Sequence, residues 1–266
     1  MTGLGAALVA GLTTVGLEEV LASAALQDRV DRKYLVRAGT AQQLLDALAD
    51  DHRVLSVDGR RAQAYSTVYL DSADLACHRA HLQGRRRRWK ARTRRYLGSD
   101  LTRLELKTKG LRGRTVKAAV DVPVEAHGLA DAAAHAFVDD GLRAAYGTGL
   151  QLALLPVLEV RYVRTTVVAR TGGERLTLDT DLEVRTPAGV LVGAMAPDAV
   201  LVESKAGGRP GRSDRVLRSL GVREASCSKY CVGTALARPD LPAAPWRPLL
   251  AGWFSATARD DLRLAA

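Results

Sequence analysis

The sequence predicts an α+β protein built on one large antiparallel sheet that could close into a barrel. Apolar and polar residues alternate over many short segments, as expected of strands whose successive side chains point to opposite faces. Helical patterns are scattered among these segments, which favours α+β over a parallel α/β fold. With 266 residues, the chain is long enough to bury a sizeable core.

Alternation with a period of two predicts nine strands in the central part of the chain. They cover residues 31–37, 64–71, 85–97, 101–109, 114–124, 156–169, 174–185, 189–193 and 199–206. Helical periodicity predicts helices near 14–27, 40–50, 72–83, 128–145, 212–220 and 229–237. Four prolines between 239 and 248 then interrupt the chain before a last helix near 249–262.

These patterns divide the chain into three parts. Residues 1–28 are interpreted as an N-terminal helical segment, 29–237 as the main domain, and 238–266 as a Pro-rich linker with a C-terminal helix. The apolar start lacks a basic region, and Glu18 and Glu19 interrupt it, which argues against a signal peptide or a spanning helix. A cytoplasmic location is therefore expected, with membrane association only through a partner.

The positive charge is concentrated in one segment. The chain has a net charge of +10, and residues 85–95 (RRRRWKARTRR) hold eight Lys and Arg residues without an acid, which leaves +2 for the rest. Such a segment implies a polyanionic partner, namely nucleic acid, an acidic membrane or a phosphate chain. Nucleic acid is not favoured, because Trp89 is the only aromatic residue in this segment that could stack on a base.

Several predicted strands carry one charged and one largely apolar face. The charged faces include Arg88, Lys90, Arg92, Arg94, Lys107, Lys117, Tyr162, Arg164, Glu203 and Lys205. Charged faces usually point to solvent, but cations on consecutive strands would repel one another without a polyanion. The alternative is an inverted barrel with its charges inside, and periodicity does not choose between the two arrangements. There is no P-loop, Rossmann, GxSxG or kinase motif.

An ordered set of segments resembles the VTC polyphosphate polymerase family, within the CYTH or triphosphate tunnel metalloenzyme superfamily. The segments are DRKYLV (31–36), YSTVYLDSADLACHRAHLQGRRRRWKARTRRY (65–96), LELKTKG (104–110), VRYVRTTV (160–167), RLTLDTDL (175–182), VLVESKA (200–206) and SKY (228–230). The resemblance implies an antiparallel tunnel barrel with a charged lumen and helices packed outside. It also makes 29–237 a tunnel-barrel catalytic domain.

The resemblance also implies roles for single residues. The basic positions that would contact phosphate during catalysis are Lys33, Arg92, Arg94, Lys107, Arg164 and Lys229. Tyr162 and Ser228 match substrate-binding positions, and Arg88, Lys90, Lys117 and Lys205 share the tunnel-lining faces. Glu203 matches the glutamate that holds a divalent metal, Mn²⁺ or Mg²⁺. Taken by themselves, Ser228 and Lys229 could simply cap and open a helix.

The implied activity is transfer of the γ-phosphate of ATP to a growing polyphosphate chain. Hydrolytic relatives open with Glu-x-Glu-x-Lys, whereas this chain has Arg29-x-Asp31-x-Lys33, which favours polymerisation. The alternatives are a triphosphatase acting on inorganic or organic triphosphates, and a non-catalytic polyphosphate-binding module. The expected partners are ATP or another triphosphate, polyphosphate, and a separate membrane protein.

Overall fold

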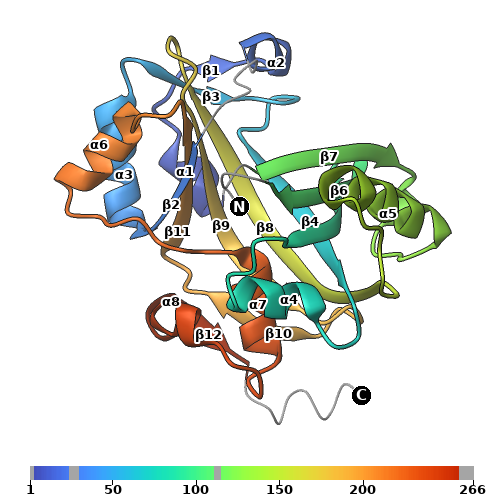
Figure 1. Ribbon diagram of the computed structural model, residues 1–266. Helices are drawn as coiled ribbons and strands as arrows, with labels where there is room; N and C mark the ends of the chain where they lie inside the picture. The colour runs from blue at the N-terminus through green and yellow to red at the C-terminus, as the bar shows by residue number, and fades with distance from the viewer. Residues whose placement is uncertain (1–2, 24–29, 111–114, 258–266) are drawn as a thin grey trace. The chain divides into compact units, whose positions relative to one another are not determined.

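The computed structural model describes residues 3–23, 30–110 and 115–257, and these contain twelve strands (Figure 1). They are β1 (Thr14–Val15), β2 (Val30–Arg37), β3 (His52–Leu55), β4 (Ala62–Asp71), β5 (Trp89–Leu97), β6 (Thr102–Lys109), β7 (Thr115–Val122), β8 (Leu155–Ala169), β9 (Arg175–Arg185), β10 (Leu191–Met195), β11 (Ala199–Ala206) and β12 (Phe254–Ala256).

The helices of the described residues are mostly short. They are α1 (Leu4–Leu8), α2 (Leu17–Ser23), α3 (Ala38–Leu48), α4 (Ala76–Leu82), α5 (Ala132–Tyr146), α6 (Arg212–Ser219), α7 (Lys229–Ala237) and α8 (Arg247–Trp253), with 3₁₀ turns at Val124–Ala126 and Ala244–Trp246. None of the helices within the described ranges has the length and apolar character that a membrane span would need.

Hydrogen bonds join the strands into one sheet, which confirms the predicted α+β class. The order is β12-β10-β9-β8-β4-β5-β6-β7, with β11 also paired to β9 and β2 paired to β11. Among the strand pairs whose register is described, only β1 and β3 run parallel. Within the described strands, β2 and β7 are not hydrogen-bonded to each other, so backbone pairing does not close the sheet into a ring.

Most predicted elements lie within a few residues of the observed ones, but several predictions were wrong in part. Residues 85–88 are not part of a strand, because the chain turns there and β5 begins at Trp89. The strands β1 and β3 were missed, since they are too short for alternation to be recognised, and the helix predicted from residue 14 begins at Leu17. The last predicted helix (249–262) ends at Trp253, where β12 follows, and its residues 258–262 lie outside the described residues. Residues 24–27 of the first predicted helix also lie outside them.

The chain contacts define two compact units. Unit 1 comprises residues 1–64, 162–182 and 195–227, and unit 2 comprises 65–161, 183–194 and 228–266. The long strands β8 and β9 contribute residues to both units.

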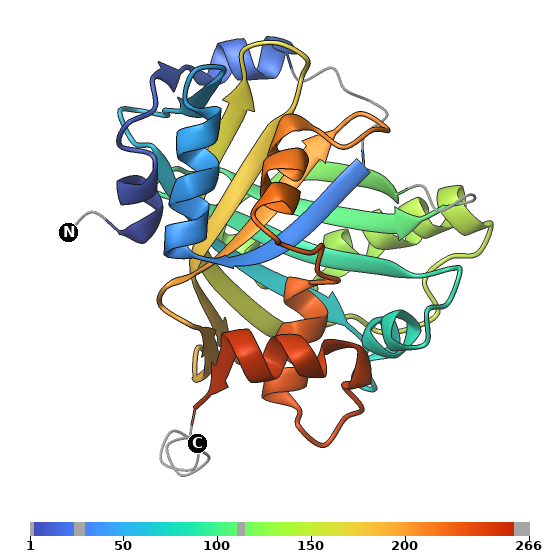
Figure 2. The same cartoon turned by 90° about the vertical axis from the view of Figure 1, so that its left-hand side faces the viewer.

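In unit 1, helices cover one face of the strands β2, β11 and β9. Helices α3 and α6 lie side by side over β2 and β11 (Figure 1, Figure 2). The core between them contains Leu44 and Leu45 of α3, Leu217 of α6, and Leu178 and Val202 of the strands. These helices fold here because their apolar residues recur at helical spacing and find an apolar strand face to cover.

In unit 2, the helix α5 covers one face of the antiparallel strands β5, β6 and β7 (Figure 1). Leu104 and Leu106 of β6 pack against Val138 and Leu142 of α5, and all four are buried. Asp131 caps the helix by accepting a hydrogen bond from the backbone N–H of Ala134 at 2.8 Å. The apolar face of this hairpin is therefore the one that α5 covers.

Candidate phosphate-binding site

The register of unit 1 aligns charged residues across three strands. Glu203 of β11 pairs with Lys33 of β2 and with Thr177 of β9. Lys205 pairs with Asp31 on one side and with Arg175 on the other. Directly paired residues share a face of the sheet, and the residues between them contact the helix-covered side. Leu176 belongs to the core under α3 and α6, Ser204 lies 3.3 Å from the Ser213 hydroxyl of α6, and Arg32 pairs with Asp214 of the same helix. The charged face of unit 1 is therefore the face that these helices leave uncovered.

Arg164 of β8 is held on this face by a buried carboxylate. Its Nε donates to Oδ1 of Asp179 at 2.6 Å, and its NH2 donates to Oδ2 at 2.8 Å. Asp179 is fully buried. Burial alone would lower the pKa of Arg164, but Asp179 raises it well above its usual value, so the guanidinium stays charged. The Tyr162 ring centre lies 5.3 Å from the guanidinium carbon, which adds a cation–π contact.

Lys205 and Glu203 form an ion pair on the same face. Their charged atoms are 3.3 Å apart, and the side chains are only 10% and 13% exposed. Burial lowers the pKa of Lys205 to about 8, and it outweighs the opposing effect of Glu203 because Arg164 and Arg175 are also close. Lys33 lies beside Glu203 in the register, and its Nζ donates to the Cys227 carbonyl at 2.9 Å.

Unit 2 has a charged face of its own, opposite the face that α5 covers. Lys90 of β5, Lys107 of β6 and Lys117 of β7 occupy one cross-strand row. Like charges directly opposite each other are destabilising, so this row favours an anion above it. Lys90 Nζ donates to the Ser228 hydroxyl at 2.8 Å.

Next to this row, Glu105 lies among three cations. Its carboxylate is fully buried and accepts from Arg92 Nε at 2.6 Å. Arg94 lies 3.8 Å away, and Lys117 forms a short ion pair with the other oxygen. Burial would raise the pKa of Glu105, but the three cations hold it well below its usual value. The rings of Tyr69 and Tyr65 lie beside Arg92 and Arg94, respectively.

The remaining predicted site residues of unit 2 lie at chain turns and a helix start. Ser228 caps α7 by accepting from the Cys231 N–H at 3.3 Å, as the structural alternative predicted, and Lys229 is the first residue of that helix. Arg88 precedes β5, and its guanidinium donates to the carbonyls of Gly84 and Arg85. The prediction that Arg88 lies on a strand face was therefore wrong, because the strand begins one residue later.

Two residues that organise the site were not among the predicted site residues. Glu105 and Asp179 each fix an arginine. The sequence signal for Glu105 was a carboxylate between Arg103 and Lys107 on one strand face, whereas the alternate residues around Asp179 include Arg175 and a second acid, Asp181. Asp179 accepts two hydrogen bonds from Arg164. Asp181 instead accepts from the Thr180 hydroxyl at 2.9 Å.

The acidic residues suit a metal only in combination with substrate. No group of three or more His, Cys, Asp or Glu side chains in the described ranges is arranged to hold a metal ion. Mg²⁺ and Mn²⁺ usually take one or two carboxylates and complete their shells with substrate phosphates and water. Glu203 fits this pattern, because its carboxylate lies between the cationic side chains expected to hold those phosphates.

Comparison with known proteins identifies the family. The model of the VTC domain matches residues 28–238, which is most of the chain. This chain belongs to the VTC domain family. The match includes both charged faces described above. No curated protein matches the chain.

Among solved structures, three similar ones come from a plant, a bacterium and an archaeon. A proposed adenylyl cyclase from Hippeastrum, described as having a dominant triphosphatase activity, is 18% identical over 78% of this chain and 95% of its own (TM-score 0.49). A proposed adenylate cyclase from Bacillus halodurans is 13% identical over 76% and 94% (TM-score 0.47). A Pyrococcus horikoshii protein is 15% identical over 80% and 99% (TM-score 0.43).

Proposed function

We propose that this VTC-domain protein is a metal-dependent ATP–polyphosphate phosphotransferase, which transfers the γ-phosphate of ATP to the end of a growing polyphosphate chain. The observation that carries the proposal is the VTC-domain match over residues 28–238. The two charged strand faces support it, because they present cations at the regular spacing of strands. Alternate residues on one strand lie about 7 Å apart on the same face, which suits a ligand with charge repeated along a line.

The types of cation also suit phosphate. Arginine presents a planar fork that binds phosphate oxygens in a bidentate manner, whereas lysine acts as a mobile point charge. Arg164 and Arg92 have their Nε atoms held by Asp179 and Glu105, so little side-chain freedom is lost when phosphate binds. Lys107 and Lys33 would add positive charge along the polyphosphate chain. This division gives rigid arginines for orientation and lysines for charge.

The reaction needs positioning and charge neutralisation more than covalent chemistry by the protein. A terminal oxygen of the polyphosphate chain attacks the γ-phosphorus of ATP. The bond from that phosphorus to the β–γ bridging oxygen breaks, and ADP leaves with the electron pair. The residues proposed to contact phosphate during catalysis are Lys33 and Arg164 of unit 1, and Arg92, Arg94, Lys107 and Lys229 of unit 2. Mg²⁺ or Mn²⁺ held by Glu203 would supply additional charge neutralisation on the phosphate oxygens.

Transfer is favoured over hydrolysis by the small number of acids on the opening strand. The pattern Arg29-x-Asp31-x-Lys33 replaces one carboxylate with a base and shortens another. In unit 1, Glu203 is paired with Lys205 and Asp179 with Arg164. A metal-rich site that activates water is therefore less well supported than a cation-rich site that holds two phosphate groups. The product would pass to a separate membrane protein.

The test is to incubate the purified protein with ATP and Mn²⁺ and to measure acid-labile long-chain phosphate. The proposal expects chains that grow with time in step with ADP. Glu203→Gln should abolish growth, whereas Glu18→Gln, a change of the same kind on the exposed helix α2, should not. Release of free phosphate alone would identify a triphosphatase, and binding without turnover would identify a polyphosphate-binding module.

A further inference from the structure

Unit 1 contains a second polar feature, a pocket of about 600 Å³ beside the N-terminus of α6. The turn between β8 and β9 lines one side, and the loop from Ala206 to Arg212 lines another. Asp51 and His52 complete the wall, and three arginines, Arg209, Arg212 and Arg215, are among the lining residues. None of these residues was assigned a role by the sequence or belongs to the charged faces.

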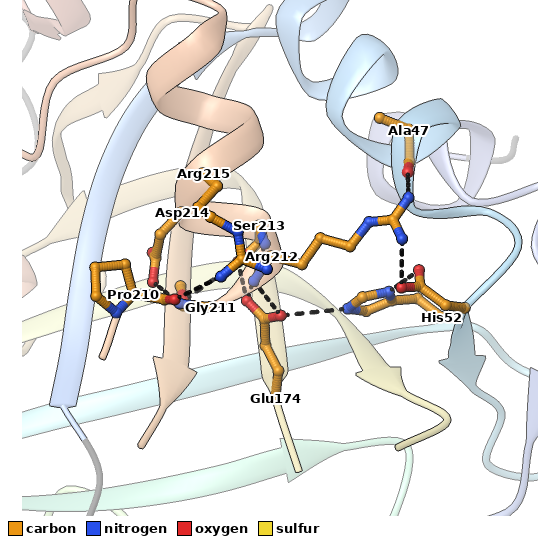
Figure 3. Close-up of polar contacts among 11 residues, drawn as sticks. Ala47, His52, Glu174, Pro210, Gly211, Arg212, Ser213, Asp214 and Arg215 are labelled. Carbon is orange, nitrogen blue, oxygen red and sulfur yellow. Dashed lines mark hydrogen bonds and ion pairs between the residues drawn. The ribbon is translucent and has the colours of Figure 1, made fainter. Parts of the chain in front are cut away.

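The acids of this pocket are already neutralised by their neighbours (Figure 3). Glu174 accepts from the backbone N–H groups of Arg212 at 2.8 Å and Ser213 at 3.0 Å. His52 Nε2 lies 3.7 Å from Glu174, and its Nδ1 is 2.7 Å from Asp51. Arg212 also pairs with Asp51 at 2.8 Å. The two carboxylates thus face a histidine, an arginine and a helix N-terminus. Because these groups already balance the carboxylates, the positive charges of Arg209 and Arg215 are not cancelled.

The surroundings of His52 favour its charged form. Burial would lower its pKa, but hydrogen bonds and charge from Glu174 and Asp51 raise it above its usual value. The pKa values of both carboxyl groups are lowered. The helix N-terminus is occupied by Glu174, so it is not available to an external anion. The charge left for a ligand comes from other groups.

Two arginines supply that charge. Arg209 is exposed and has no hydrogen bond or ion pair to another residue within the described ranges. Arg215 is exposed and uses NH1 to donate to the Pro210 carbonyl at 3.0 Å, which leaves its other nitrogen atoms to the pocket. Around Gly207 and Gly208, an added Cβ would meet nothing within 4 Å, so a ligand can approach the backbone there.

The pocket begins where the charged face of unit 1 ends. Ala206 and Glu174 line the pocket, and they directly adjoin Lys205 and Arg175 in the sequence. Lys205 and Arg175 are cross-strand partners at the last residues of β11 and the first of β9. Because alternate residues point to opposite faces, the cations lie on the charged face and the pocket residues on the other. Only the strand ends separate the two.

We propose that this pocket binds the distal part of a polyphosphate chain whose other end lies on the charged face. The proposal rests on the proposed function for the chemical class of the ligand. A linear polyanion that leaves the row of Lys205 and Arg175 passes the strand ends and meets Arg209 and Arg215. A short phosphate such as tripolyphosphate occupies the charged face alone and gains nothing from the pocket.

The test compares long-chain polyphosphate with tripolyphosphate as ligands of the unmodified protein and of Arg209→Glu/Arg215→Glu. We expect the double variant to bind the long chain about tenfold more weakly, since two exposed contacts are lost and replaced by repulsion. Tripolyphosphate affinity should not change, which also shows that the variant is folded. The dependence of long-chain binding on salt should become shallower by about one to two counterions.

The matched control is Arg218→Glu/Arg223→Glu, which reverses two exposed arginines near α6 that do not line the pocket. Equal losses in both double variants, or equal losses for long and short phosphates, would overturn the proposal. The proposal would also be overturned if single-stranded RNA bound as tightly as polyphosphate and lost as much affinity in Arg209→Glu/Arg215→Glu. Binding is measured without turnover, so it does not depend on catalysis. If the protein makes no chains, the proposed function is refuted, but the binding comparison still shows whether the pocket holds polyphosphate.

Discussion

Replacing Glu105 by glutamine removes the negative charge around which the cations of unit 2 are arranged. The carboxylate is fully buried, lies 2.6 Å from Arg92 and 3.8 Å from Arg94, and pairs with Lys117. Glutamine keeps the shape but leaves three cations close together without an anion. Removing one partner of a buried ion pair costs about 3–5 kcal/mol, so we expect the free energy of unfolding to fall by that amount. The corresponding fall in melting temperature is about 10 °C.

The same variant should respond to its ligand and to pH in distinctive ways. Tripolyphosphate supplies the missing negative charge, so it should stabilise Glu105→Gln more than the unmodified protein. The folded-state pKa of Glu105 is lowered, so its contribution to stability is fully present above the unfolded pKa and is lost as the pH falls through the folded value. The stability difference between the two proteins should therefore shrink as the pH falls below about 4.5.

The assay is thermal and urea unfolding, with and without tripolyphosphate, over a range of acidic pH. Glu183→Gln is the matched control, because its carboxylate is 39% exposed and pairs with Arg185 near the surface. We expect that control to lose less than about 1 kcal/mol. A Glu105→Gln protein as stable as the control, or one that tripolyphosphate does not rescue, would refute the electrostatic role assigned to this carboxylate.

Three further predictions test other parts of the account. Arg164→Lys should lower kcat/KM for chain growth about a hundredfold, because lysine cannot reproduce the bidentate contact with Asp179; an unchanged value would exclude Arg164 from orienting the phosphate. Tripolyphosphate affinity should weaken as the pH rises through about 8, where Lys205 loses its proton, and Lys205→Arg should remove that dependence. If both proteins showed the same pH profile, the titrating group would be one other than Lys205. Gly211→Ala should lower the free energy of unfolding in urea by about 1–2 kcal/mol, because the added Cβ would collide with the Glu174 carboxylate that caps α6. Gly208→Ala, where the added Cβ meets open space, should leave stability unchanged, and equal effects of the two changes would contradict the capping role.

Strand alternation was sufficient to predict which residues share a face, but not which face is covered. Lys90, Arg92 and Arg94 share one side of β5, as predicted, because a period of two is fixed by backbone geometry. The choice between inward and outward charges depends on where helices such as α3 and α5 pack. That packing brings together segments far apart in the sequence, which periodicity does not register.

The grouping of Glu105 with three cations needed the register between strands. Lys117 reaches Glu105 diagonally, because Lys117 pairs with Lys107 and not with Glu105 itself. Register depends on the turns that join the strands, so a single residue of slip would separate this group. The pocket beside α6 was missed for a related reason, since His52 and Glu174 are more than a hundred residues apart and meet only in the folded chain.

The most direct test of the proposed phosphotransferase follows the γ-phosphate of ATP. The protein is given ATP labelled in the γ-phosphate together with Mn²⁺, and the label is divided by size separation between long-chain phosphate and free phosphate. We expect that early in the reaction most of the transferred label enters long chains, in step with the ADP formed, and that Glu203→Gln prevents it. Label found only in free phosphate, with ADP still formed, would contradict it.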